Sequence, residues 1–269
     1  MKRFLQGFGA GGAVATLAGL IGLGGAEFRL PILKGLFGLD TLKAVVLNKA
    51  TSLIVVFFAL LFRSHEIPFE QIWEHKSIII NLLLGSLVGA WIAAGFAMKI
   101  DEALLDRIIF FLLLFLAAVL LLEHWFLQDQ QGALFDTLYL QIIAGILAGF
   151  GIGVVASMLG VAGGELLIPV IVLLYGVDVK LAGSLSLAIS LPTMIVGFAR
   201  YSRSQAFVVL EEERSLFIAL AIGSVVGAAI GSALLGIVSS NMLVLLLAFV
   251  LMISAYKIFH HQSNLSKKK

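Results

Sequence analysis

The chain is a succession of long uncharged stretches separated by short polar segments. A bilayer core is about 30 Å thick, so a membrane-spanning helix needs roughly 20 apolar residues. The longest stretch, 215–256, is long enough for two spans joined by a turn at 239–241. The pattern therefore predicts eight membrane-spanning helices. In chain order they lie at 4–26, 44–62, 77–98, 103–122, 138–164 and 181–199, followed by the two spans within 215–256.

Two further apolar segments are too short to cross a membrane on their own. Residues 28–39 follow the first predicted span, and residues 166–177 follow the fifth. We expect both to be interfacial or re-entrant pieces attached to interrupted helices.

Composition narrows the class of protein. Apolar residues make up 61% of the 269 residues and charged residues 13%, with a mean hydropathy of +1.10. A soluble domain averages roughly 45–50% apolar and about 25% charged, so lipid must surround much of this surface. The chain has no cysteine, which excludes disulfides and thiolate metal sites, and its net charge of +2 gives no reason to expect nucleic acid as a partner. We expect an all-α polytopic membrane protein.

The distribution of Lys and Arg among the predicted loops indicates an orientation. The side that holds both termini has more of these residues, including Arg63, whereas Arg29 and Lys43 fall in loops on the other side. The positive-inside rule then places both termini in the cytoplasm and the protein, as a multi-pass protein, in the inner (plasma) membrane. The basic start resembles a signal peptide, but the apolar run is long and rich in glycine, so we expect a retained helix.

The two halves of the chain repeat one another. Adding 138 to a residue number takes Glu27 to Glu165 and Asp40 to Asp178, and glycines and prolines recur at the same shift. Chance apolar similarity would not place such residues in register. The expected divisions are a first repeat of four spans over 1–125, a polar linker over 126–137, and a second repeat of four spans with a basic tail over 138–269.

Internal repeats with interrupted helices at matching positions are typical of transporters. With four spans per repeat, both copies insert in the same orientation, which is the arrangement we favour. If the short segments crossed the membrane, each repeat would have five spans and the two copies would be inverted.

Each repeat opens with a glycine-rich element followed by a proline. Glycine permits unwound backbone and proline removes a donor, so we expect the first helix of each repeat to be broken within the membrane. Free N–H groups and the positive end of a helix dipole favour an anion, and two facing breaks would form a cradle for one. The expected binding residues are Gly22, Gly24, Gly25, Gly160, Gly163 and Gly164, with Pro31 and Pro169 as helix breakers.

Close helix packing is the alternative interpretation of glycine-rich segments. It is the one we favour for Gly85 and Gly89, and for Gly223, Gly227 and Gly231. Only the elements that open each repeat combine helix breakers with an acidic residue.

Glu27 and Glu165 lie beside the two glycine elements. A carboxylate within or at the edge of a membrane is costly and usually functional, so one hypothesis is that these residues couple proton movement to substrate movement. The alternative is that each Glu caps its own short helix by accepting backbone N–H bonds.

A second repeated feature lies on the second and sixth spans. Asn48 and Ser52 are four residues apart, so they share one helix face, and the shift of 138 takes them to Ser186 and Ser190. We expect these side chains to line a substrate pathway. Hydrogen bonding between helices is the alternative.

The repeated glycine and proline element, together with the length, the eight spans and the duplication, resembles the sulfite exporter family of the TauE/SafE type, also called sulfonate-uptake permeases. The resemblance covers nearly the whole chain. It implies a multi-pass permease of the inner membrane whose substrates are sulfite, sulfonates and related organosulfur anions. The positions that carry it are Gly22, Gly24, Gly25, Pro31, Gly160, Gly163, Gly164 and Pro169.

These observations predict a secondary-active transporter for a small anion, with proton coupling as a hypothesis. An uncoupled channel or a structural membrane subunit is the alternative. The sequence contains no nucleophile–base pair, so we do not expect an enzyme, and we expect no cofactor. The expected partners are the anion and the bilayer, and a homo-oligomer remains open.

Overall fold

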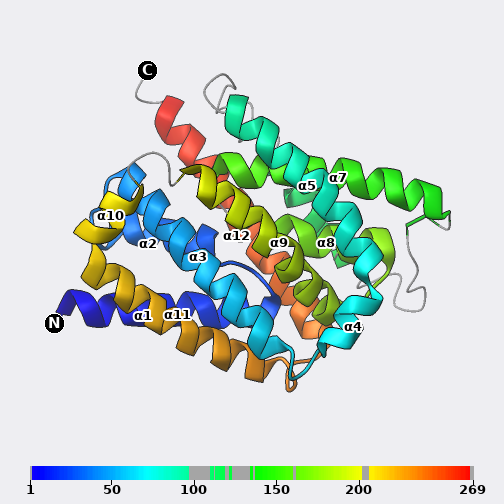
Figure 1. Ribbon diagram of the computed structural model, residues 1–269, viewed down its shortest axis with the longest axis horizontal. Coiled ribbons are helices and arrows are strands. Elements are labelled where there is room, and N and C mark those ends of the chain that lie inside the picture. Colours follow the sequence, from blue (N-terminus) through cyan, green and yellow to red (C-terminus); the bar gives the residue numbers. More distant parts are fainter. Residues whose placement is uncertain are drawn as a thin grey trace.

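The computed structural model describes most of the chain. The described residues are 2–96, 110–111, 113–118, 121–122, 134–135, 137–159, 162–201 and 206–266. Within these ranges the chain forms helices joined by short turns, as expected for an all-α protein (Figure 1).

The described helices follow the predicted apolar stretches closely. In chain order they are α1 (Lys2–Ile21), α2 (Ala26–Gly35), α3 (Thr41–Arg63), α4 (Phe69–Glu74), α5 (Lys76–Phe96), α7 (Leu138–Leu159), α8 (Gly164–Tyr175), α9 (Val179–Tyr201), α10 (Ala206–Glu212), α11 (Arg214–Leu234) and α12 (Ser240–Ser266).

Six of these helices are long and apolar enough to cross a membrane, namely α1, α3, α5, α7, α9 and α11. Shorter apolar helices are α8 and, over Ser240–Tyr256, the first part of α12. Seven of the eight predicted spans thus coincide with described helices. Half of the residues of the predicted span at 103–122 lie outside the described residues.

Three of the long helices begin at one end of the molecule, which we call the terminal end. Arg3 near the start of α1 forms an ion pair with Glu213, which directly precedes α11. Lys43 near the start of α3 pairs with the neighbouring Glu212. The starts of α1, α3 and α11 therefore lie together.

The same three helices finish at the opposite end, which we call the loop end. Arg63 at the end of α3 donates to the carbonyl of Gly19 near the end of α1 and to the carbonyl of Lys180 near the start of α9. Glu66, just after α3, lies against Gly236, just after α11. The helix α9 therefore begins at the loop end and runs opposite to α3.

The helices α5 and α7 also begin at the loop end. Asn81, near the start of α5, donates to the carbonyl of Gln141 near the start of α7 and to the hydroxyl of Tyr175 at the end of α8. Since α5 follows α3 through the short helix α4, its start and the start of α7 lie where α3 ends. The helices α1 and α7, which the shift of 138 relates, thus run in opposite directions (Figure 1).

The expectation that corresponding helices of the two halves run in the same direction is therefore wrong for α1 and α7. The short helices are the reason, because α2 brings the chain back to the terminal end, where α3 begins, and α8 brings it back to the loop end, where α9 begins. In the described residues, each half thus contains one return passage, through α2 or α8, that the count of long apolar stretches did not include.

Glycine faces hold the long helices together in two parallel pairs, α1 with α11 and α5 with α7 (Figure 1). A Cβ atom on Gly227 of α11 would meet the carbonyl oxygen of Gly12 in α1. A Cβ atom on Gly85 of α5 would meet the carbonyl oxygen of Ile146 in α7. Backbone-to-backbone contact of this kind confirms the packing interpretation of these glycines.

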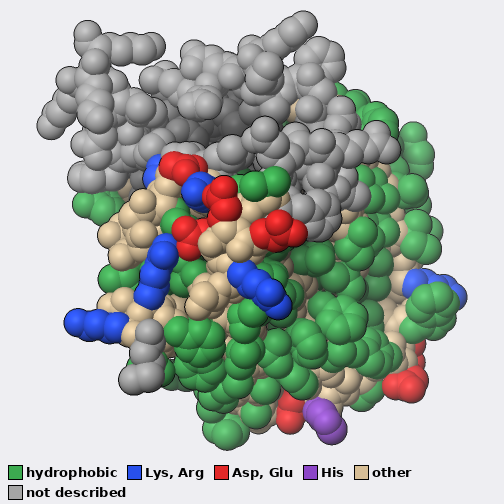
Figure 2. Space-filling view, turned by 60° about the vertical axis from the view of Figure 1, so that its left-hand side comes forward, with side chains coloured by type: hydrophobic (Ala, Val, Ile, Leu, Met, Phe, Trp, Pro, Cys, Tyr) green, Lys and Arg blue, Asp and Glu red, His purple; other side chains and the backbone are tan. Residues whose placement is uncertain are grey.

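The outer surface is strongly apolar. In Figure 2 apolar side chains cover a broad part of the face shown, and charged side chains gather mainly in one patch. Large side chains such as Trp91 (65% exposed), Phe115 (63%) and Leu147 (65%) point outward from α5, the described segment 113–118 and α7. Such a surface is stable when lipid replaces water around it.

Candidate functional site

The first helix break lies between α1 and α2. The backbone of Gly22 has φ of +100° and that of Gly25 has φ of +67°, values that a residue with a side chain rarely adopts. The amides of Gly22 and Leu23 both donate to the carbonyl of Ala18, which closes the end of α1. Gly25 then serves as the N-cap of α2. The sequence prediction of a break at this position is confirmed.

The second break precedes α8. Gly163 has φ of +76° and is the N-cap of this helix, in the same role as Gly25 in the first half. Gly164 is the first residue of α8. Gly160, the remaining glycine of the predicted set, lies outside the described residues.

Glycine alone forms these breaks. Pro31 and Pro169, which we expected to act as helix breakers, lie inside α2 and α8. Each stands five residues after the first residue of its helix, so it removes only a bond to the first turn. The prolines therefore do not end or interrupt either helix.

The two breaks touch one another. A Cβ atom on Gly24 would lie 2.5 Å from the Cβ of Ala162, and one on Gly164 would lie 3.3 Å from the Cα of Leu23. We call the contact between residues 22–25 and 162–164 the break junction. Larger side chains at these glycines would force the two segments apart.

Polar side chains of α3 and α9 bind the backbone at the junction. Asn48 on α3 donates to the carbonyl of Ala26 at 2.9 Å, and Ser190 on α9 donates to the carbonyl of Ala162 at 2.9 Å. Hydrogen bonding to other elements, the alternative for these residues, is thus observed for Asn48 and Ser190, and also for Ser52, which accepts a bond from Arg29 of α2. The Oγ of Ser186, which is fully buried, has no hydrogen-bond partner among the described residues.

Sequence reasoning missed a buried cation at the junction. Arg29 of α2, which we assigned to a loop, is 0% exposed. Its Nη1 donates to Ser52 Oγ at 2.8 Å and lies 3.4 Å from Asn48 Oδ1. A Cβ atom on Gly25 would lie 3.5 Å from Nη2, so the guanidinium lies beside the start of α2. Its position within an apolar segment, two residues after Glu27, was the available signal.

The two acidic residues lie in the first turns of the helices that leave the junction. Glu27 is half-buried in α2 and interacts electrostatically with Arg29, and Glu165 in α8 is 8% exposed. A carboxylate in the first turn of a helix interacts favourably with the positive end of the helix dipole. Helix stabilisation and proton coupling therefore both remain predictions for these residues.

Comparison with known proteins decides the family. The model of the family described as sulfite exporter TauE/SafE matches residues 7–258, which is nearly the whole chain. The chain belongs to the sulfite exporter TauE/SafE family. It is accordingly a multi-pass membrane transporter and not an enzyme. No curated protein and no solved structure matches the chain significantly.

A second buried arginine of this TauE/SafE transporter fixes the helices around the junction. Arg63, also 0% exposed, donates to the carbonyls of Gly19 and Leu20 at 2.8 and 2.7 Å. It also donates to Ser184 Oγ at 3.0 Å and to the carbonyl of Lys180 at 2.6 Å. Arg63 therefore caps the C-terminus of α1 and ties it to α9.

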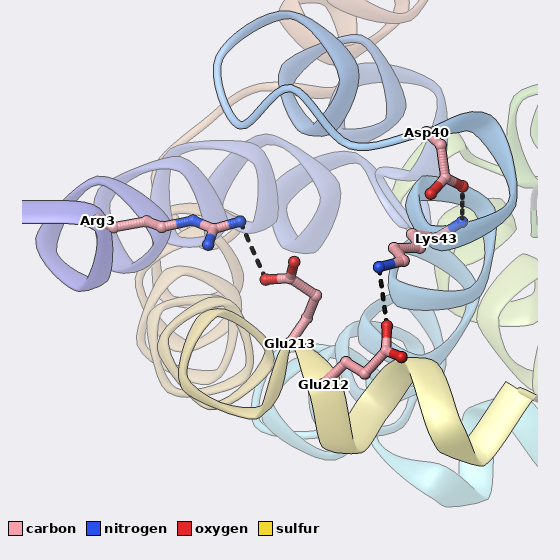
Figure 3. Close-up of polar contacts among 5 residues, drawn as sticks. All are labelled: Arg3, Asp40, Lys43, Glu212 and Glu213. Atoms are coloured by element: carbon pink, nitrogen blue, oxygen red, sulfur yellow. Dashed lines mark hydrogen bonds and ion pairs between the residues drawn. The ribbon is translucent and has the colours of Figure 1, made fainter.

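Two ion pairs lie at the terminal end of the transporter (Figure 3). Arg3 lies 3.0 Å from Glu213, and Lys43 lies 2.8 Å from Glu212 (Figure 3). The amide of Lys43 also donates to Asp40 Oδ1, which caps α3. Counting charges in loops had placed Arg3 and Lys43 on opposite sides of the membrane, whereas the cluster brings them to one end.

Proposed function

We propose that this TauE/SafE family member is a secondary-active transporter for a small sulfur-containing anion such as sulfite or a sulfonate, and that the anion binds at the break junction. The contact between the two breaks carries this proposal. At the junction α2 and α8 both begin with a left-handed glycine that supplies no side-chain cap. Helix N-termini arranged in this way favour a negatively charged ligand.

The proposed binding residues are those of the two breaks and of the helices that contact them. They are Gly22, Gly24 and Gly25 with Gly160, Gly163 and Gly164, together with Asn48, Ser52, Ser186 and Ser190.

We further propose that the two halves, over 1–125 and 138–269, are inverted repeats that move against one another around the junction. Opposite directions of α1 and α7 support this arrangement. In transporters built from inverted repeats, alternating access is largely a rocking of one unit against the other around a fixed site. Arg3, Lys43 and Arg214 lie at the terminal end, which supports a cytoplasmic location for both termini in the plasma membrane.

Flux into proteoliposomes tests the proposed function. Purified full-length protein is reconstituted, a pH gradient is imposed, and uptake of sulfite, thiosulfate, methanesulfonate and acetate is measured. A secondary transporter gives saturable uptake that exceeds the equilibrium concentration and prefers the sulfur anions. An uncoupled channel gives flux without accumulation, and a structural subunit gives none. Either of the last two results would contradict the proposal.

The same assay tests proton coupling through Glu27 and Glu165. In the variants Glu27→Gln and Glu165→Gln the side chains keep nearly the same size but can no longer bind and release a proton. We expect uptake that no longer responds to the imposed pH gradient. Full pH-dependent accumulation in both variants would show that the two carboxylates only stabilise their helices.

A further inference from the structure

The guanidinium of Arg29 has one occupied edge and one unoccupied edge. Its Nη1 is held by Ser52 and Asn48 of α3, at 2.8 and 3.4 Å. Among the described residues, neither Nε nor Nη2 has a hydrogen-bond partner, although the side chain is 0% exposed. A fully buried cation with unused donors is a costly arrangement unless a ligand completes it.

The surroundings of Arg29 add to the positive potential. Its Nη2 lies beside Gly25, the N-cap of α2, where the positive end of the helix dipole is found. The carboxylate of Glu27 supplies some opposite charge through space, but the hydrogen-bonding capacity of the guanidinium edge is not used by it. Both the charge and the dipole therefore favour an anion at this edge.

The geometry of the unoccupied edge matches an oxyanion. Nε and Nη2 are adjacent, roughly parallel donors, and such a fork binds two oxygen atoms of a carboxylate, sulfonate or similar group. Ser52 and Asn48 hold the other end of the guanidinium and so fix its plane. On the other side of the junction, the hydroxyl of Ser186, also without a hydrogen-bond partner among the described residues, lies beside Gly164.

We propose that Arg29 is the charge-bearing ligand of the transported anion, which it binds through two oxygen atoms at Nε and Nη2. This inference rests on the proposed function and specifies the chemistry of its site. Leu167 occupies the position that corresponds to Arg29 in the second half. Among the described residues of the two short helices, α2 therefore carries a buried cation and α8 does not, so we expect each chain to bind a single anion at the junction.

If Arg29 had only a structural role, its replacement would lower the stability of the protein. Arg63 shows what such a residue looks like in this fold, because its donors bind three carbonyls and a hydroxyl. Replacing it must destabilise the protein. Replacing Arg29 in the absence of anion removes an incompletely paired buried charge, so the stability of Arg29→Met should equal or exceed that of the wild type.

Binding of methanesulfonate and sulfite to the purified full-length protein in detergent tests the inference. Titration calorimetry gives Kd for the wild type, Arg29→Lys, Arg29→Gln and the control Lys34→Gln, which removes an exposed charge from the same helix. We expect Arg29→Gln to raise Kd on the order of a hundredfold. Arg29→Lys should be intermediate, since an ammonium keeps the charge without the fork, and Lys34→Gln should change Kd less than twofold.

Dimethyl sulfone, a neutral compound of similar shape, is the second probe. The wild type should prefer methanesulfonate to the sulfone strongly, and Arg29→Gln should lose this preference. Wild-type Kd in a folded Arg29→Gln protein, or a marked fall in Tm of ligand-free Arg29→Met, would overturn the inference. Arg29-dependent binding without flux would reject the proposed transport but keep Arg29 as the ligand of the bound anion, whereas flux unaffected by Arg29→Gln would reject the role of Arg29 alone.

Discussion

At the scale of single residues, the two buried arginines illustrate how similar side chains take different roles. Both are 0% exposed and lie on helices next to the break junction. Arg63 is saturated by backbone carbonyls, so its charge is compensated by dipoles that the fold itself supplies. Arg29 keeps two nitrogen atoms without a partner among the described residues. The hydropathy pattern assigned both arginines to loops, because it depends on the charge of a side chain and not on its burial.

Replacing Arg63 tests its role in closing α1. In Arg63→Met, the carbonyls of Gly19, Leu20 and Lys180 lose their donors inside the protein, and each unsatisfied group costs about 1–3 kcal/mol. We expect a loss of at least about 3 kcal/mol in the free energy of unfolding, visible as a lower Tm in detergent. The control Arg214→Met changes an exposed arginine at the start of α11 and should leave Tm nearly unchanged. Equal effects of the two variants would contradict the assignment.

At the scale of elements, the sequence predicts the positions of the two helix breaks but not the burial of the helix that follows the second. Clustered glycine located both interruptions, because few other residues adopt positive φ, and the short helices α2 and α8 appeared as the apolar segments 28–39 and 166–177. Each helix begins earlier than its segment, since a glycine N-cap lets the helix start directly after the break. That α8 is buried could not be predicted, because burial of Ile168 and Ile171 depends on how other helices, mainly α7 and α9, pack against it.

Gly25 and Gly38 separate backbone strain from close packing. Both have a left-handed backbone, with φ of +67° and +66°, so Ala at either position costs about 1–2 kcal/mol. A Cβ atom on Gly25 would also lie 2.8 Å from Val14 Cγ1, whereas one on Gly38 meets nothing within 4 Å. We expect Gly25→Ala to lower both Tm and the rate of anion uptake more than Gly38→Ala does. Indistinguishable variants would argue against a tightly packed junction.

At the scale of the whole molecule, the sequence did not reveal the relative direction of corresponding helices in the two halves. Counting only long apolar stretches gave an even number of crossings in each half, which predicts that α1 and α7 run in the same direction, whereas they run in opposite directions (Figure 1). One short helix in each half, α2 or α8, adds a return passage that the count of long apolar stretches left out. No feature of composition distinguishes a segment that returns through the protein from one that lies at the interface.

Labelling of single cysteines tests this topology, because the natural chain has none. Thr137→Cys at the start of α7 and Ser239→Cys between α11 and α12 should react with a membrane-impermeant maleimide from the same side, and Lys2→Cys from the other side. All three positions are exposed. Vesicles of both orientations supply the control for access. A parallel arrangement instead predicts that Thr137→Cys and Lys2→Cys react from the same side.

The parallel contacts of α1 with α11 and of α5 with α7 have a consequence for either half taken alone. Each of these pairs joins a helix from one half to a helix from the other, through glycine faces that leave no room for lipid. A polypeptide carrying only residues 1–125 would expose both of its faces to hydrocarbon. It could cover these faces by pairing with a second molecule inserted in the opposite orientation. A functional half-length protein would therefore have to insert in both orientations in the same membrane.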